Sequence, residues 1–224
     1  MKNSLFLVFI LTSSMASAQY NVIAPENFVK SFALDQSTGK TNPDVKGSPY
    51  LNDEFVNGEV YYSGKYLVKG VLLRYNLHGD AIQFSHKGKV MELDPAMKID
   101  KVIIGNDNFV KLKKSSSSKV PEGFVKVWND QYPRIITKMK TQFFKKEETQ
   151  AFSEPRPARY ERRPDENFLM KEEGVFERVK SVKKLIQSLG DFQSELNSFA
   201  KKEKVSTNDA SELAKLMDYY VSLK

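Results

Sequence analysis

The sequence predicts an α+β fold: an antiparallel β-sheet body, built as a rolled sheet or a partly closed barrel, followed by a C-terminal tail of three helices. From residue 50 onward, short runs rich in β-branched and aromatic residues alternate with glycine-containing turns, which is typical of an antiparallel meander. After residue 180, apolar residues recur every three or four positions, which is typical of amphipathic helices. With 40% hydrophobic and 12% aromatic residues, the 224-residue chain can bury a core of its own.

Residues 1–18 have the layout of a secretory signal peptide. Lys2 supplies a positive charge, residues 5–11 (LFLVFIL) are uniformly apolar, and Ala16-Ser17-Ala18 is an A-x-A cleavage site. The apolar run is shorter than the roughly 20 residues that a membrane span needs. We therefore expect cleavage before Gln19. The mature chain is then an exported, soluble protein of the periplasm or the extracellular space, without a transmembrane segment.

The segment 19–48 is predicted to be weakly structured. Residues 27–34 (NFVKSFAL) fit either one short helix or one short strand, because their periodicity is weak. Residues 35–43 (DQSTGKTNP) have the composition of a loop.

The β body is predicted over residues 49–147. Its short strand-like runs are separated by turns at residues 63–64, 77–80, 87–88 and 105–108. The last run, residues 132–144, is assigned to a strand, with a helix as the alternative, because it contains the β-branched Ile135-Ile136-Thr137. On such a strand Lys138 and Lys140 share one face, which we expect to face solvent.

Residues 148–165 interrupt the pattern. Three prolines within residues 155–164 do not fit a helix or a central strand, so this segment is predicted to be a linker or a strap. A guanidinium group can donate two parallel hydrogen bonds to a carboxylate or a phosphate, and a tyrosine ring can stack on a ligand. The candidate binding residues for an anionic partner are therefore Arg156, Arg159, Tyr160, Arg162 and Arg163.

Residues 166–224 are predicted to form a β-hairpin and then the three helices. Gly190 is expected to end the first helix, and Asp191 to cap the second. Asp209 and Glu212 have capping-box spacing at the start of the third. Because short amphipathic helices cannot bury their stripes alone, we expect them to pack on one another and on the sheet. The residues expected to share this interior are Leu185, Phe192, Leu196, Leu213 and Met217.

Three segments resemble a family of exported proteins from Bacteroidota-type bacteria for which no activity is established. They are residues 47–55 (GSPYLNDEF), residues 73–76 (LRYN) and residues 216–223 (LMDYYVSL). The resemblance covers most of residues 47–224, and it implies export, a β-rich body and a short helical tail. The arginine-rich strap departs from the family pattern, so the resemblance implies nothing about it.

The composition excludes every site that depends on cysteine, and the sequence lacks several common catalytic and nucleotide-binding motifs. A chain without cysteine has no disulfide, thiolate zinc site, iron–sulfur cluster or cysteine nucleophile. The P-loop, G-x-G-x-x-G, H-E-x-x-H and G-x-S-x-G motifs are absent from the sequence. The two histidines, His78 and His86, lie in predicted turns, and a metal site needs them to converge with a carboxylate such as Asp80. We predict neither a metal nor a cofactor.

These observations predict a non-enzymatic binding module or an envelope-associated module. A net charge of +7 favours an anionic partner, namely an anionic glycan, a lipid headgroup or an envelope protein, and we do not expect nucleic acid. The alternative is a carboxylate-based hydrolase acting on an envelope or extracellular glycan, for which Asp53 and Glu54 are the best-placed pair. A concave pocket that holds paired carboxylates favours the enzyme, and an exposed basic patch favours binding.

Overall fold

The computed structural model describes residues 20–35, 44–113, 121–147 and 156–224. The predicted signal peptide, the serines at 115–118 and the first part of the strap lie outside these ranges. Within them the α+β class is confirmed, with a large antiparallel sheet and three helices after the last strand. No helix in the described ranges is long and apolar enough to cross a membrane.

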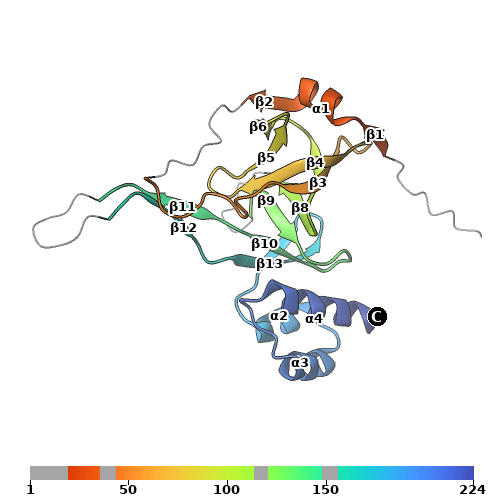
Figure 1. Ribbon diagram of the computed structural model, residues 1–224. Coiled ribbons are helices and arrows are strands. Elements are labelled where there is room, and N and C mark those ends of the chain that lie inside the picture. Colours follow the sequence, from red (N-terminus) through yellow and green to blue (C-terminus); the bar gives the residue numbers. More distant parts are fainter. Residues whose placement is uncertain (1–19, 36–43, 114–120, 148–155) are drawn as a thin grey trace, which may run out of the picture.

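Most strands belong to one sheet. Its members are β1 (Asn21–Ile23), β2 (Ala33–Asp35), β3 (Val56–Tyr62), β4 (Tyr66–Asn76), β5 (Ala81–His86), β6 (Lys89–Leu93), β7 (Ile99–Ile104), β8 (Asp107–Leu112), β9 (Gly123–Val127), β10 (Arg134–Lys138), β13 (Glu166–Glu172) and β14 (Val175–Arg178). The strand order is β14-β13-β10-β9-β8-β7-β3-β4-β5-β6-β2, and β1 pairs in parallel with β4. The sheet curls without closing on itself, so the prediction of a rolled sheet is confirmed (Figure 1).

The segment after residue 19 contains more regular structure than its weak periodicity predicts. Helix α1 (Pro25–Phe32) stands between β1 and β2, and all three elements contact or pair with the rolled sheet. Phe28 is 1% exposed, and its ring lies 5.8 Å from the ring of Tyr62 and 5.7 Å from that of Phe84. One buried aromatic residue therefore anchors a helix whose own sequence pattern is weak.

The run predicted as one strand over residues 132–144 is extended, but it is split into β10 and β11 (Thr141–Phe144). Strand β11 leaves the main sheet and pairs antiparallel with β12 (Arg159–Arg162). The two strands form a ribbon that projects from the body (Figure 1). Part of the predicted strap is thus a strand, because Pro157 and Pro164 flank β12 and remove no hydrogen bond from its pairing with β11.

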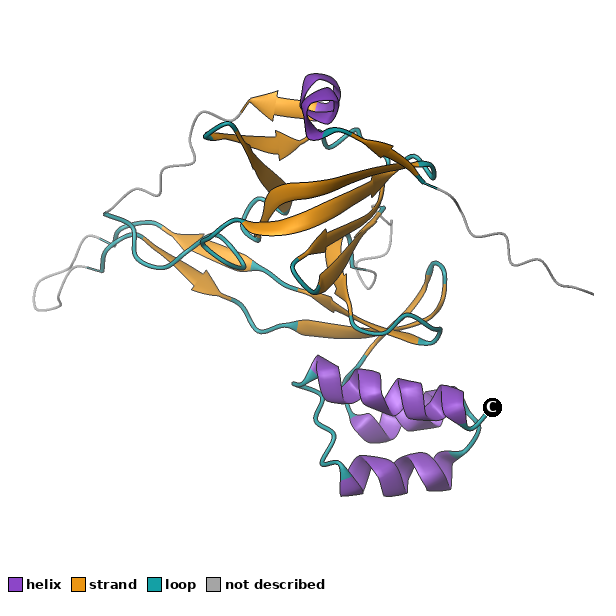
Figure 2. Ribbon diagram, turned by 45° about the vertical axis from the view of Figure 1, so that its right-hand side comes forward, coloured by secondary structure: helices purple, strands orange, loops and turns teal. Residues whose placement is uncertain are grey.

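The tail consists of α2 (Val182–Leu189), α3 (Gln193–Lys202) and α4 (Ala210–Ser222). The three helices pack against one another and α4 contacts β10, while α3 lies on the side of the tail away from the sheet (Figure 1 and Figure 2). Ile135 from β10 and Leu169 from β13 complete their hydrophobic cluster, and both side chains are fully buried. Of the five residues predicted to share this interior, Leu185, Leu196, Leu213 and Met217 are buried in the cluster, whereas Phe192 is 36% exposed.

Candidate anion-binding site

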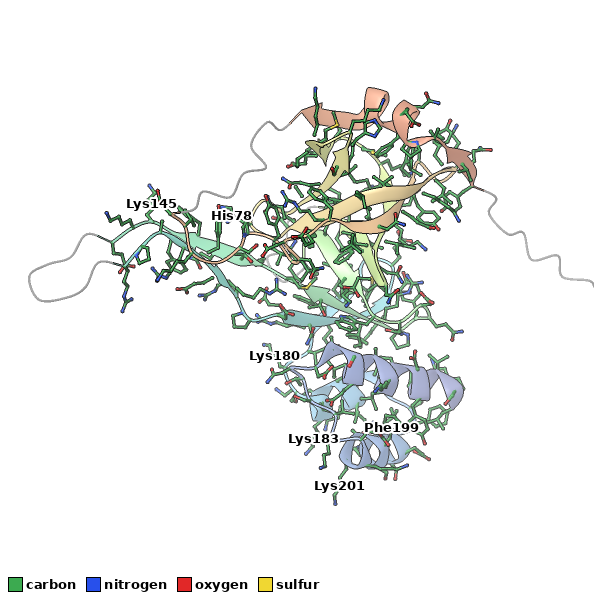
Figure 3. All side chains as sticks on the ribbon, in the orientation of Figure 1. His78, Lys145, Lys180, Lys183, Phe199 and Lys201 are labelled. Atoms are coloured by element: carbon green, nitrogen blue, oxygen red, sulfur yellow. The ribbon has the colours of Figure 1, made fainter. Side chains whose placement is uncertain are left out.

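The candidate site is built around the projecting ribbon. We call residues 140–147 and 156–165, which comprise β11, β12 and their flanks, the arm. The arm carries seven cationic side chains and three carboxylates, a net charge of +4 within a chain whose net charge is +7. None of its side chains belongs to a hydrophobic cluster of the described core. Figure 3 shows Lys145 toward the outer end of the arm and His78 nearer the body.

Aromatic contacts attach the arm to the turn after β4. Tyr160 faces Phe143 across the ribbon with ring centroids 5.0 Å apart, and the ring of His78 lies edge-on to Tyr160 at 5.3 Å. The Nδ1 atom of His78 is 3.3 Å from the carbonyl oxygen of Thr141. On the other edge of β12, Gly47 has a φ of +75°, and a Cβ atom there would overlap the carbonyl oxygen of Tyr160. Only glycine allows residues 46–47 to run this close to the ribbon.

The five residues predicted to bind an anion do not form one free cluster. Arg159 is held by the carboxylates of Glu161 and Glu147 and lies over the ring of Phe144. Arg162 pairs with Asp165 at 2.6 Å, and Tyr160 is packed as described above.

Arg156 and Arg163 have no side-chain partner among the described residues. They lie at opposite ends of the segment, roughly 20 Å apart for seven residues of extended chain. The predicted set therefore supplies two separate cations that remain available to a ligand, one at the outer end of the arm and one at its base.

A hollow of about 550 Å³ opens at the base of the arm. The residues that line it are His78, Lys140, Thr141, Gln142, Arg163, Pro164, Asp165, Glu166 and Arg178. The backbone N–H of Arg163 donates to the carbonyl oxygen of Lys140 at 2.9 Å, so these two residues are neighbours on adjacent chain segments. Arg163 belongs to the set predicted from the sequence, whereas Lys140 joins it only through the pairing of β11 with β12.

The charges around the hollow are unevenly matched. Glu166 pairs with Arg178 at 2.8 Å, and Asp165 is occupied by Arg162. Partial burial raises the pKa of the Asp165 carboxyl, and the nearby Arg162 opposes the shift. Lys140 and Arg163 have no carboxylate partner among the described residues. Two neighbouring cations repel each other, and an anion between them relieves that repulsion.

Lys138, predicted to face solvent, is buried, because Asp80 and the carbonyl oxygen of Phe124 hold its ammonium group inside the fold. Lys140, which follows the end of β10, is exposed as predicted. The Lys138 side chain is 5% exposed, and its Nζ atom lies 2.9 Å from Asp80 and donates to the carbonyl oxygen of Phe124 at 3.0 Å. Burial lowers the pKa of Lys138, and the Asp80 carboxylate opposes the shift. Asp80 also accepts hydrogen bonds from the hydroxyl of Tyr75 and the backbone N–H of Phe124.

This network fixes the turn that carries His78 to β9 and β10, beside the hollow. Asp80 thus serves as an ion-pair partner in the structure.

The second histidine, His86, ends β5 in register with Lys89 of β6. In the described ranges, no group of three or more histidine, aspartate and glutamate side chains is placed to hold a metal ion.

Asp53 and Glu54, the pair considered for hydrolysis, are exposed and lie outside the hollow. Beside them, Arg74 is 7% exposed and lies between the rings of Tyr50 and Phe55. Its guanidinium donates to the hydroxyl of Tyr50 at 2.8 Å and to the backbone carbonyl of Asp53 at 3.2 Å. Two of the segments that carry the family resemblance thus meet at this arginine, where they tie the 50–55 turn to β4.

No protein-family model, no curated protein and no solved structure matches this chain. The functional conclusion therefore rests on the chemistry and geometry of the arm and the hollow.

Proposed function

We propose that the chain is an exported, non-enzymatic binding protein whose arm contacts an anionic glycan. The observation that carries this proposal is the concentration of net charge, +4 in the arm against +7 for the chain, on a ribbon that stands away from the body. Lys145, Lys146 and Arg156 are exposed at its outer part and have no ion-pair partner among the described residues. Clustered, unpaired cations attract polyanions and speed their association.

The mixed lining of the hollow supports a glycan over a lipid headgroup. Acidic sugars carry carboxylates together with many neutral hydroxyl groups. Lys140 and Arg163 suit the former, while Gln142, Asp165 and Glu166 offer acceptors for the latter. A membrane surface presents phosphates at high density, which the two carboxylates disfavour.

The arrangement of carboxylates favours binding over hydrolysis. A glycosidase of this type needs one carboxyl group that holds a proton and a second that is ionised. Asp165 and Glu166 line the hollow, but Asp165 forms an ion pair with Arg162 and Glu166 forms one with Arg178. Neither is a free carboxyl group placed for proton transfer.

The test is retention of the mature protein on an immobilised uronic-acid polysaccharide. We expect the triple variant K145Q/K146Q/R156Q to elute at lower salt than the wild type, because the contacts are electrostatic and screened by salt. The matched control is K180Q/K183Q/K201Q, which removes three exposed lysines from the tail, where Figure 3 shows them, and changes the net charge equally. The control is expected to elute close to the wild type.

Three results would contradict the proposal. The first is failure of the wild type to be retained at low salt. The second is an equal shift of both triple variants, which would show that net charge alone governs retention. Stronger binding to vesicles of anionic phospholipid than to the polysaccharide would assign the arm to a lipid surface instead.

A further inference from the structure

The hollow at the base of the arm differs from the rest of the basic surface because two neighbouring cations, Lys140 and Arg163, line one open concave site. Strand pairing positions Lys140 beside Arg163 through a backbone hydrogen bond of 2.9 Å. Pro164 follows Arg163 and restricts its backbone, and the ion pair between Arg178 and Glu166 forms another part of the lining. A site of about 550 Å³ is in the range of small-molecule sites.

We propose that this hollow binds one carboxylate-bearing sugar unit, with its carboxylate between the side chains of Lys140 and Arg163. This inference rests on the proposed function and assigns a discrete site to it. The guanidinium of Arg163 can donate two parallel hydrogen bonds to a carboxylate, and the ammonium of Lys140 adds a second positive charge. Thr141 and Gln142 also line the hollow and carry groups that can hydrogen-bond to the hydroxyls of the sugar ring.

The experiment is calorimetric titration of the mature protein with a uronic-acid disaccharide, with the neutral disaccharide of the same size as a reference. We expect K140Q/R163Q to weaken binding of the acidic disaccharide at least tenfold, since it removes both charged contacts. The matched control K180Q/K183Q carries the same change in net charge on the tail and is expected to bind like the wild type. Unchanged circular dichroism of both double variants excludes unfolding as the cause.

Equal binding of the acidic and neutral disaccharides, or of inorganic phosphate and the acidic disaccharide, contradicts the carboxylate-sugar site. If the polysaccharide binds wild type and K140Q/R163Q equally while the arm variant loses it, the hollow inference fails and the arm proposal stands.

Discussion

At the scale of single residues, Gly123 makes room for the half-buried ion pair between Lys138 and Asp80. Its φ is +75°, and a Cβ atom there would overlap the Oδ2 atom of Asp80, the partner of Lys138. Gly64 has a similar φ of +68° but open space around it. The two glycines thus separate the cost of a left-handed backbone from the cost of displacing a charged side chain.

We therefore expect Gly64→Ala to lower the free energy of unfolding by about 1–2 kcal/mol, through backbone strain alone. Gly123→Ala should lower it by about 3 kcal/mol or more, because it also pushes Asp80 away from Lys138 and from the N–H of Phe124. Urea unfolding monitored by circular dichroism measures both values. Equal losses for the two variants would show that Asp80 does not depend on the space at Gly123.

These residue-level features are also where sequence reasoning is weakest. Alternation places Lys138 on the solvent side, but its partner Asp80 is contributed by a turn far away in the chain. Arg74 lies in a segment that the sequence marks as distinctive, yet its burial depends on Tyr50, Phe55 and Gln83 from other parts of the chain. A buried cation is recognisable only when its distant acceptors are known. The same holds for Lys140, whose neighbour in the hollow is Arg163.

At the scale of elements, the sequence predicts hairpins and helix ends well where neighbouring residues decide them. Gly190 ends α2 with a φ of +86°, and the carboxylate of Asp209 accepts from the N–H groups of Ser211 and Glu212 at the start of α4. The start of α3 differs: Phe192, with a φ of +54°, takes the position predicted for Asp191 and makes no side-chain cap. The short turn between α2 and α3 sets this geometry, and the preference of aspartate for a cap does not override it.

The buried apolar face of the C-terminal helices leads to a prediction about stability. Leu196 on α3 is fully buried, and Leu72 on β4 is 45% exposed. Leu196→Ala should lower the free energy of unfolding by about 2–5 kcal/mol, because it leaves a cavity among the three helices. Leu72→Ala deletes the same atoms where water can fill the space and should cost well under half as much. A loss below about 0.5 kcal/mol at Leu196 would mean that the stripe faces solvent.

At the scale of the whole molecule, the α+β class is predictable and the strand order is not. Local alternation identifies the strands, but β3 pairs with β7 and β10 pairs with β13 across intervening elements. Such pairings are decided by packing and by the twist of the sheet, which a single sequence does not display. Pairing with a distant strand also explains why the run over residues 132–144 is split into β10 and β11. The partner of β11 is β12, which lies in the proline-rich segment.

Export is the prediction that concerns the whole chain. The proposed cleavage before Gln19 leaves β1, which begins at Asn21, available to pair with β4. Expression in a bacterium with a general secretory pathway should yield an exported form whose intact mass corresponds to residues 19–224. An exported or cell-associated form that retains Met1 would overturn the assignment. Replacement of Ala16 and Ala18 by Leu should block processing and serves as the control.

The separation of the arm from the hydrophobic clusters has an evolutionary consequence. Substitutions at Lys145, Lys146 or Arg156 leave every described cluster intact, so selection on them acts through what the arm contacts and little through folding. Under the proposed function, related chains that bind different polymers are expected to differ at this surface. Gly123, Leu196 and Arg74 stay under constraint from stability, so related chains should share a conserved scaffold and differ most along the arm.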